Sequence, residues 1–379
     1  MNIQRQKICF VLTVDYAVKA FLLNHLRALS QFYDITVIVN TDNHSFLAEV
    51  GINAKVIPLK ISRNISFFSD LMCLFKLIYI FQSQRFTAIH SLMPKSGLLA
   101  MLAAWIVRIP LRTHTFTGQV WATKIGFKRF ILKQFDCLIA TLSTNNIVDS
   151  PSQRQFLLEN KVITPAKSMV FCKGSVSGVD AARFKPNLQS KINIRQQLSI
   201  SDEAIIFLFI GRLNKDKGVL DLAHAFKQLN HQLAHLVCVG QDEQNMQADM
   251  MSIVGINSSN VHFIKHTSAP EAYMASADVL CLPSYREGFG MVIIEAAAVG
   301  IPAIASRIYG IADAVVDGET GLLHEPRKVE DIKNSMRRLI ENKLFRLKLG
   351  ELARARAIKD FDSNAITQEW VKFYQGNVR

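Results

Sequence analysis

The sequence predicts an α/β protein with two facing, Rossmann-like, doubly wound parallel sheets and an active site in the cleft between them. The chain has 379 residues, more than one core usually supports, so two domains are expected; one uninterrupted barrel is the alternative at this length. Short apolar runs alternate with amphipathic helical stretches, and this alternation occurs twice along the chain. Between the two occurrences, glycines, serines and a proline from Gly174 to Pro186 interrupt both periodicities.

The predicted strands are short apolar runs of the kind that parallel sheets bury on both faces. In the first half they are Lys7 to Leu12, Ile35 to Val39, Ala88 to His90, Leu111 to Thr115, Cys137 to Thr141 and Met169 to Cys172. In the second half they are Ala204 to Ile210, Leu236 to Val239, Val261 to Ile264, Val279 to Leu282, Ile301 to Ala305 and Gly321 to Leu323.

The domain boundaries follow from this pattern. Residues 1–180 are predicted to form the N-terminal domain and residues 181–363 the C-terminal domain. Within residues 364–379, a last helix from Asn364 to Gly376 is predicted to pack back on the N-terminal domain. Since parallel sheets bind ligands beyond the carboxyl ends of their strands, two facing sheets would form the site between them.

Composition and targeting patterns indicate a cytosolic globular protein. Hydrophobic residues make up 49% of the chain, enough for a core. The six cysteines form neither a CxxC pair nor a Cys/His cluster, which argues against zinc and disulfides. The N-terminal apolar run is too short for a secretory signal, and the longest apolar stretches do not reach the roughly 20 residues that span a bilayer. We therefore expect a cytoplasmic protein.

The positive charge is concentrated in the first half of the chain. Residues 1–180 carry +11 of the net +13, and Leu71 to Phe135 contains no acidic residue. An anionic partner is expected. The segment Phe127 to Phe135 alternates basic with apolar residues, as in a helix that lies on anionic lipid headgroups; an ordinary half-buried helix is the alternative. No module for base readout is present, so no specific nucleic-acid partner is expected.

The segment Ser284 to Gly300 is the strongest candidate site. An apolar strand leads into a loop with Gly288 and Gly290, and a helix follows. Backbone N–H groups at such a helix start can bind phosphate, and the glycines let a ligand approach the backbone. Glu287 and Glu295 flank the turn and can accept hydrogen bonds from sugar and ribose hydroxyls. Helix capping by Glu287 and a solvent-facing Glu295 are the alternative.

A second glycine turn follows the first strand of the C-terminal domain, in the segment Phe209 to Gly218. Its cations, Arg212 and Lys217, are placed to neutralise a diphosphate and to stabilise the charge that develops as a glycosyl bond breaks. A solvated turn in which Asp216 pairs with a neighbour is the alternative.

Together, the segments GRLNKDKG, ADVLCLPSYREGFG and AAAVGIP resemble the donor domain of family 4 retaining glycosyltransferases of the GT-B fold. The segments HSLMPKSG, THTFTGQVW and GSVSGVDAARFKP extend the resemblance to the bacterial capsule and O-antigen branch. It implies retention of configuration without a metal or another cofactor. It also implies a nucleotide-sugar donor, UDP-linked in preference to GDP-linked, and a polyprenyl-pyrophosphate-linked glycan acceptor at the inner face of the cytoplasmic membrane, where the enzyme would be a peripheral protein.

The resemblance also implies residue roles. The catalytic and donor-binding residues would be Arg212, Lys217, Glu287, Gly288, Phe289, Gly290, Met291 and Glu295. On the other side of the cleft, either His114 or Thr117 would face the reacting centre, because the His-Gly pair of many relatives is absent here. His90 and Lys95 follow a strand and are candidates for acceptor contact.

Two other functions are compatible with doubly wound sheets. An NAD-dependent oxidoreductase needs a GxGxxG loop after its first strand, and the sequence VLTVDYAVKAF has no glycine there. A non-catalytic nucleotide-sugar-binding protein with the same fold is the remaining alternative.

Overall fold

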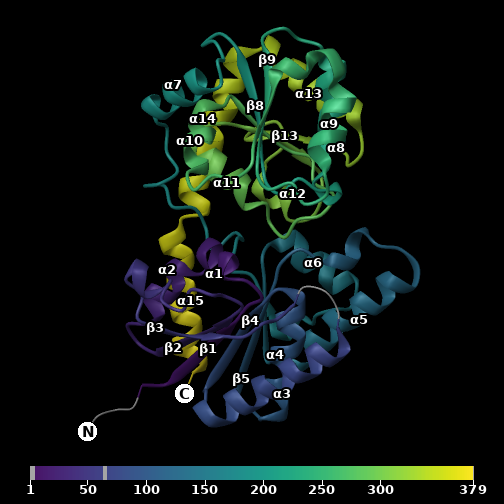
Figure 1. The fold of residues 1–379 in the computed structure, drawn as a ribbon. Helices are drawn as coiled ribbons and strands as arrows, with labels where there is room; N and C mark the ends of the chain where they lie inside the picture. The colour runs from purple at the N-terminus through teal and green to yellow at the C-terminus, as the bar shows by residue number, and fades with distance from the viewer. Residues whose placement is uncertain (1–4, 63–65, 379) are drawn as a thin grey trace. The chain divides into compact units, whose positions relative to one another are not determined.

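The computed structural model describes residues 5–62 and 66–378 and divides into two compact units (Figure 1). Unit 1 comprises Met1–Ser177 with Ser363–Arg379, and unit 2 comprises Gly178–Asp362. The chain first passes from unit 1 to unit 2 after Ser177. This position lies inside the segment Gly174 to Pro186, which interrupts both sequence periodicities. Each unit has its own parallel sheet.

The sheet of unit 1 has seven strands in the order β3-β2-β1-β4-β5-β6-β7, and all of its pairings are parallel. The order runs outward from β1 in one direction and from β4 in the other, so the carboxyl ends of these two strands meet at a switch point. The strands are β1 (Lys7–Val11), β2 (Asp34–Val39), β3 (Ala54–Pro58), β4 (Ala88–Leu92), β5 (Leu111–Phe116), β6 (Asn145–Val148) and β7 (Ser168–Met169).

Two strand predictions in unit 1 were wrong. Cys137 to Thr141 lies in a helix, because Asp136, Ile139 and Ala140 continue its buried face and the strand follows only at Asn145–Val148. Ala54–Pro58 was missed, since this edge strand is only partly buried and lacks a continuous apolar run.

Helices cover both faces of this sheet, and residues of β1 alternate between two apolar clusters. On one face α4 packs against both α3 and α5; on the other, α15, coloured yellow, lies beside α2 (Figure 1). The helices are α1 (Asp15–Phe21), α2 (Leu23–Leu29), α3 (Phe67–Gln84), α4 (Pro94–Ile106), α5 (Gly126–Leu142), α6 (Pro151–Glu159) and α15 (Ser363–Asn377), with short 3-10 turns η1 (Ala48–Val50), η2 (Val120–Thr123) and η3 (Pro165–Lys167).

The C-terminal helix α15 is part of the unit 1 core. The Trp370 ring is sandwiched between His25, at 4.6 Å between ring centroids, and His90, at 4.7 Å. His25 Nδ1 and Thr367 Oγ1 form a hydrogen bond of 2.9 Å, and His90 Nδ1 and the Tyr374 hydroxyl form one of 2.7 Å. Burial and these specific bonds fix the helix against the sheet.

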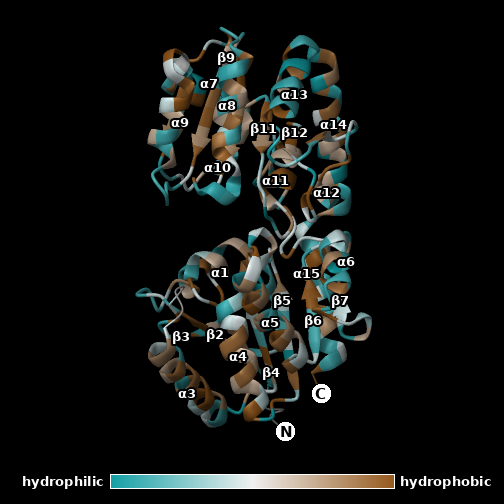
Figure 2. Ribbon diagram, turned by 90° about the vertical axis from the view of Figure 1, so that its right-hand side faces the viewer, coloured by the Kyte–Doolittle hydropathy of each residue, from teal (hydrophilic) through white to brown (hydrophobic). Residues whose placement is uncertain are grey.

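The sheet of unit 2 has six parallel strands in the order β10-β9-β8-β11-β12-β13. Hydrophobic residues run along its strands (Figure 2). The strands are β8 (Ile205–Ile210), β9 (Ala234–Val239), β10 (Val261–Ile264), β11 (Val279–Leu282), β12 (Ala303–Ser306) and β13 (Gly321–His324). The helices are α7 (Leu188–Gln197), α8 (Val219–Leu229), α9 (Met246–Val254), α10 (Pro270–Ser276), α11 (Met291–Val299), α12 (Ile311–Ala314), α13 (Val329–Glu341) and α14 (Lys343–Asp360), with 3-10 turns η4 (Lys215–Lys217) and η5 (Gly255–Asn260).

In the part of the chain that the structure describes, none of the helices has both the length and the apolar character needed to cross a membrane.

Candidate functional site

Three loops meet at the carboxyl ends of β8, β9 and β11 in unit 2. The Leu213 N–H donates to the Gln241 carbonyl at 2.9 Å, and the Glu243 N–H donates back to the Leu213 carbonyl at 3.1 Å. The Tyr285 N–H donates to the Asp216 carbonyl at 2.8 Å. Backbone hydrogen bonds therefore join the loop after β8 to both neighbouring loops, at the edge where parallel sheets bind ligands.

Glycines let these loops approach closely. Gly218 has a φ of +67°, and a Cβ atom on it would lie 2.0 Å from the Pro283 carbonyl oxygen. A Cβ atom on Gly240 would lie 1.9 Å from the Gly211 carbonyl oxygen. Any side chain at either position would separate the loops, so the spacing of the site depends on both glycines.

Lys217 and Glu287 are joined in the centre of this loop cluster. The Lys217 ammonium donates to Glu287 Oε1, and the Ser284 hydroxyl donates to the same oxygen at 2.9 Å. The Lys217 and Glu287 side chains are 19% and 15% exposed, so this pair is largely shielded from water. The sequence identified the cation and the carboxylate separately, and the structure brings them into contact. Ser284 was not singled out as a hydrogen-bonding partner.

Arg212 lies on the rim of the cluster and is half exposed. Its Nη1 atom donates to both carboxylate oxygens of Glu243, at 3.0 and 2.9 Å. The Asn214 amide nitrogen donates to the same carboxylate at 3.1 Å, while the buried Asn214 Oδ1 has no hydrogen-bond partner among the described residues. Sequence reasoning missed Asn214 and Glu243, although Glu243 follows Gly240 at the end of a predicted strand.

The helix α11 begins at Met291, directly after the glycine loop, as the motif predicts. Gly290 caps it with a φ of +83°, a conformation that favours glycine. The Phe289 side chain is buried and its ring lies 5.1 Å from that of Phe361. Phe289 therefore anchors the loop through its side chain, and only its backbone is suited to a ligand. The helix dipole favours negative charge at the start of α11, so this end is suited to an anion.

Glu295 lies one helical turn into α11 and is half-buried rather than facing open solvent. Burial raises the pKa of its carboxyl to about 7; the Arg183 charge lowers this pKa and the Glu271 charge raises it. Arg183 itself pairs with Glu271 at 2.9 Å. The carboxyl is therefore poised to change charge near neutral pH, which fits a group that exchanges hydrogen bonds with a ligand.

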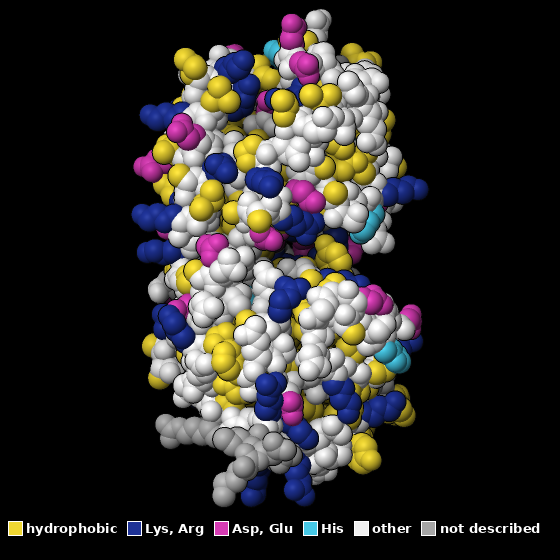
Figure 3. All heavy atoms as spheres, turned by 90° about the vertical axis from the view of Figure 1, so that its left-hand side faces the viewer, with side chains coloured by type: hydrophobic (Ala, Val, Ile, Leu, Met, Phe, Trp, Pro, Cys, Tyr) yellow, Lys and Arg dark blue, Asp and Glu magenta, His cyan; other side chains and the backbone are white. Residues whose placement is uncertain are grey.

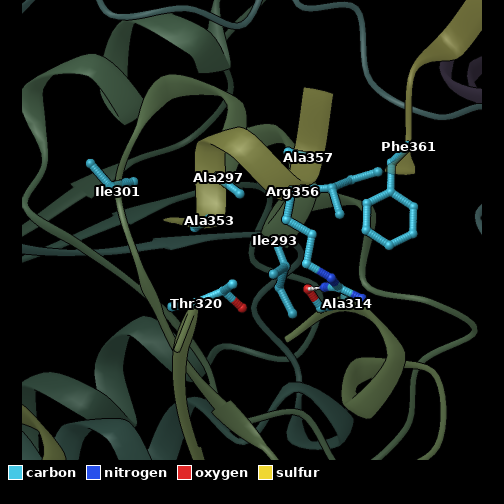
Figure 4. A pocket seen from close by; sticks show the side chains of 11 residues that line it. Ile293, Ala297, Ile301, Ala314, Thr320, Ala353, Arg356, Ala357 and Phe361 are labelled. Atoms are coloured by element: carbon cyan, nitrogen blue, oxygen red, sulfur yellow. Dashed lines mark hydrogen bonds between the residues drawn. The ribbon is translucent and has the colours of Figure 1, made fainter. Parts of the chain in front are cut away.

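A small cavity behind α11 is a packing feature. Its walls come from α11, α12 and α14, and the Arg356 guanidinium points into it (Figure 4). That group donates to the Ala314 and Asp313 carbonyls at 2.6 Å each and lies 4.9 Å from the Phe361 ring. The lining is mainly aliphatic, so this cavity is not assigned to the candidate site.

In unit 1, His114 is buried near the end of β5. Its Nδ1 and the Ser91 hydroxyl form a hydrogen bond of 2.8 Å, and burial lowers its pKa to about 3. The imidazole is therefore neutral at physiological pH. Thr117 follows the strand, and its carbonyl accepts a hydrogen bond from Gln153 Nε2 at 2.6 Å. Which of the two faces a reacting centre stays a prediction. Gln153, a residue of α6 that bonds to this loop, was not indicated by the sequence.

His90 and Lys95, the two residues predicted to contact the acceptor, lie in different environments. His90 is fully buried, with Tyr374 on Nδ1 and the Thr115 hydroxyl on Nε2, at 2.7 Å each. Both ring nitrogens therefore serve the core, an arrangement that does not favour the predicted acceptor contact. Lys95 is partly exposed and forms an ion pair of 2.7 Å with Asp70. Its acceptor contact stays a prediction.

The chain is similar to known glycosyltransferases. Residues 190–356, which carry all of the loops of the unit 2 cluster, match the family model described as glycosyl transferases group 1. The chain is 29% identical to the capsular polysaccharide biosynthesis glycosyltransferase CapM of Staphylococcus aureus, over 98% of this chain and 97% of that protein. It is 26% identical to an N,N'-diacetylbacillosaminyl-diphospho-undecaprenol alpha-1,3-N-acetylgalactosaminyltransferase of Campylobacter jejuni, over 97% and 98% of the two chains.

Among solved structures, the chain resembles HepE of Anabaena in complex with UDP and glucose. The TM-score is 0.82 at 18% identity, and the match covers 98% of this chain and 100% of that one. This likeness confirms the fold that the sequence predicted, two parallel-sheet units of the GT-B type. The comparisons agree on glycosyl transfer as the activity.

Proposed function

We propose that this glycosyltransferase transfers a sugar from a UDP-linked donor, with retention of configuration, to a polyprenyl-pyrophosphate-linked glycan during synthesis of a bacterial O-antigen or capsule. One observation carries the donor part of the proposal. The glycine loops of unit 2 hold two cations, two carboxylates and a helix start at the carboxyl end of one sheet. Such a cluster is suited to a nucleotide diphosphate linked to a sugar.

Each donor residue has a distinct role in this proposal. Arg212 and Lys217 neutralise the diphosphate, and the start of α11, with Gly288, Gly290 and Met291, receives a phosphate oxygen. Glu287 accepts hydrogen bonds from sugar hydroxyls and Glu295 from the ribose. Donor binding would exchange the Lys217–Glu287 and Arg212–Glu243 contacts for contacts with the ligand. HepE has been solved in complex with UDP and with UDP-glucose, which supports a UDP-linked donor.

The chemistry assigned to these residues is electrostatic. As the bond between the sugar and the diphosphate breaks, negative charge grows on the leaving phosphate, and the two cations stabilise it. The acceptor hydroxyl attacks on the face that the diphosphate leaves and transfers its proton to the departing phosphate, so the configuration is retained. In this proposal the cations replace a divalent metal, and no protein nucleophile is assigned. His114 or Thr117 of unit 1 would contact the sugar near the reacting centre.

The acceptor part of the proposal rests on relatives and charge. The Campylobacter jejuni relative is named for a diphospho-undecaprenol-linked acceptor, and CapM is named for capsular polysaccharide. Unit 1, the lower unit in Figure 3, shows many Lys and Arg side chains and few acidic ones on the face drawn there. These charges suit a pyrophosphate-linked glycan and an anionic membrane surface. We propose peripheral association with the cytoplasmic face of the membrane.

The experiment is a transfer assay with a panel of UDP- and GDP-sugars and a prenyl-pyrophosphate-linked acceptor, read by mass spectrometry. Transfer from one UDP-sugar by the wild type, and its loss in separate Lys217→Ala and Glu287→Ala variants, is the expected result. Binding of a UDP-sugar without turnover on any acceptor would instead indicate a nucleotide-sugar-binding protein. A GDP-sugar as the sole active donor would contradict the UDP assignment.

A further inference from the structure

The outer face of α3 in unit 1 is apolar. Phe68, Met72, Phe75 and Tyr79 follow one another at helical spacing and are 83%, 63%, 62% and 71% exposed. The opposite face of the same helix buries its own apolar residues in the core. A surface helix normally presents polar residues to water, so a helix that is apolar on both faces indicates a surface with an apolar partner.

The two neighbouring helices also carry exposed apolar residues, and α4 packs against both α3 and α5. At the end of α4, Trp105 is 54% exposed, and at the start of α5, Phe127 and Phe130 are 78% and 55% exposed. Figure 2 shows α3 and α4 side by side, both largely hydrophobic. We call the exposed apolar and basic side chains of these three adjacent helices the α3–α5 face.

The charges on the α3–α5 face are almost all positive. Asp70 is the acidic residue on α3, and it is neutralised by its ion pair with Lys95. Asp136 of α5 adds no negative charge to this surface, because its side chain is buried in the core. There it accepts a hydrogen bond from the Trp121 indole at 2.8 Å. The exposed or partly exposed cations of this face are Lys76, Lys124, Lys128, Arg129 and Lys133.

We propose that the α3–α5 face is a lipid-docking surface, in which aromatic side chains of α3 enter the interfacial region of the membrane and the cations of α5 contact anionic headgroups. This inference rests on the proposed membrane association and assigns it to a surface. A second copy of the chain fits less well, because a symmetric contact would place like charges opposite one another. Aromatic and basic side chains together are typical of helices that lie in the membrane interface.

The test compares the wild type, a Phe68→Ser/Phe75→Ser double variant and a Leu344→Ser control. Leu344 is 80% exposed at the start of α14 in unit 2, so its substitution removes a comparable apolar side chain away from the α3–α5 face. Each protein is sedimented with phosphatidylcholine vesicles that contain phosphatidylglycerol, at low and at high salt. The wild type and the control should keep a salt-resistant bound fraction, and the double variant should lose it several-fold, because salt screens charge but not apolar insertion.

Trp105 provides a second readout. Trp121 and Trp370 are buried and Trp105 is exposed, so a blue shift of tryptophan emission on adding vesicles reports Trp105. The shift should occur in the wild type and be reduced in the double variant.

Two outcomes would overturn the inference alone: equal vesicle binding by all three proteins, or a dimeric wild type that the double variant converts to monomer, which would assign the face to a second copy. Failure of the wild type to bind vesicles at low salt would overturn the membrane part of the proposed function as well. Transfer to a water-soluble acceptor, unchanged in the double variant, separates both results from a failure of the glycosyltransferase assignment.

Discussion

Lys217, on the loop after β8, donates a hydrogen bond to Glu287, 70 positions later on the loop after β11. The Ser284 hydroxyl donates to the same carboxylate oxygen at 2.9 Å. The cation assigned to the diphosphate and the carboxylate assigned to the sugar are thus hydrogen-bonded to each other. The two opposite charges compensate each other in a partly buried position. In the proposed function, a bound donor replaces this contact with contacts to itself.

Replacing either partner of this pair should affect different steps. We expect Lys217→Met to lower the affinity for UDP and to slow transfer about 100-fold, because a diphosphate cation is lost. Glu287→Gln should slow transfer similarly but leave the affinity for UDP near that of the wild type, since its contact is with the sugar. Calorimetry with UDP and steady-state kinetics measure both. Lys215→Met, which removes an exposed lysine from the same loop, is the control; equal losses of UDP affinity in the Lys217 and Glu287 variants would contradict separate roles.

Gly218→Ala should destabilise unit 2 and reduce donor binding. The new Cβ atom would lie 2.0 Å from the Pro283 carbonyl oxygen, so the loops that carry Lys217 and Glu287 must move apart. Gly318→Ala is a matched control: its φ is +78°, close to the +67° of Gly218, but nothing lies within 4 Å of its Cβ position. The control should lose only about 1 kcal/mol for the left-handed conformation. Urea unfolding and UDP binding distinguish the two; equal losses would show that the close approach is unimportant.

The affinity for UDP should rise with pH around neutrality. Burial raises the pKa of Glu295 to about 7, so the carboxyl is largely protonated below that pH and ionised above it. The ionised form accepts hydrogen bonds from both ribose hydroxyls, and the protonated form accepts fewer. Calorimetric titrations on either side of pH 7 measure this effect. The side chain in Glu295→Gln cannot ionise, so this variant shows the pH dependence that comes from the titration of UDP itself. If the affinity of the variant depends on pH as steeply as that of the wild type, Glu295 does not have this role.

The free energy of unfolding should fall in mild acid, because His25 of unit 1 is protonated more readily in the unfolded state than in the folded state. Burial lowers the pKa of His25 to about 4 from 6.5. Above pH 6.5 both the folded and the unfolded states are neutral at this residue; below it the unfolded state binds a proton that the folded state rejects. The free energy of unfolding should therefore drop by about 3 kcal/mol between pH 6.5 and pH 4 for this residue. Urea titrations across this range should give a shallower dependence in His25→Gln than in the wild type; parallel curves would contradict the assignment.

Chelation should leave the enzyme active. Since Arg212 and Lys217 are proposed to supply the positive charge at the diphosphate, we expect the transfer rate in EDTA to equal the rate in added Mg²⁺ or Mn²⁺. Loss of activity in EDTA that a divalent metal restores would contradict this part of the proposal.

The sequence by itself determined the fold class and the local elements of the donor site. Parallel strands buried on both faces are apolar runs, and the turns after them need glycine, so both features are visible in a single stretch of chain. This is why the segments around Arg212, Lys217 and Glu287 could be located. Prediction failed where a strand is not a buried apolar run, or where an apolar run is not a strand. The edge strand Ala54–Pro58 is half exposed, and Cys137 to Thr141 is an apolar run inside a helix.

Only the tertiary structure decided which side chains are partners and which are buried. The contacts of Lys217 with Glu287, of Arg212 with Glu243 and of His90 with Tyr374 join residues that are far apart in sequence. Each pairing depends on the order of strands in a sheet and on the packing of a helix, neither of which a local pattern contains. Burial has the same origin: a histidine after a strand looks the same in sequence whether it lines a site or, like His90, stacks on Trp370 in the core.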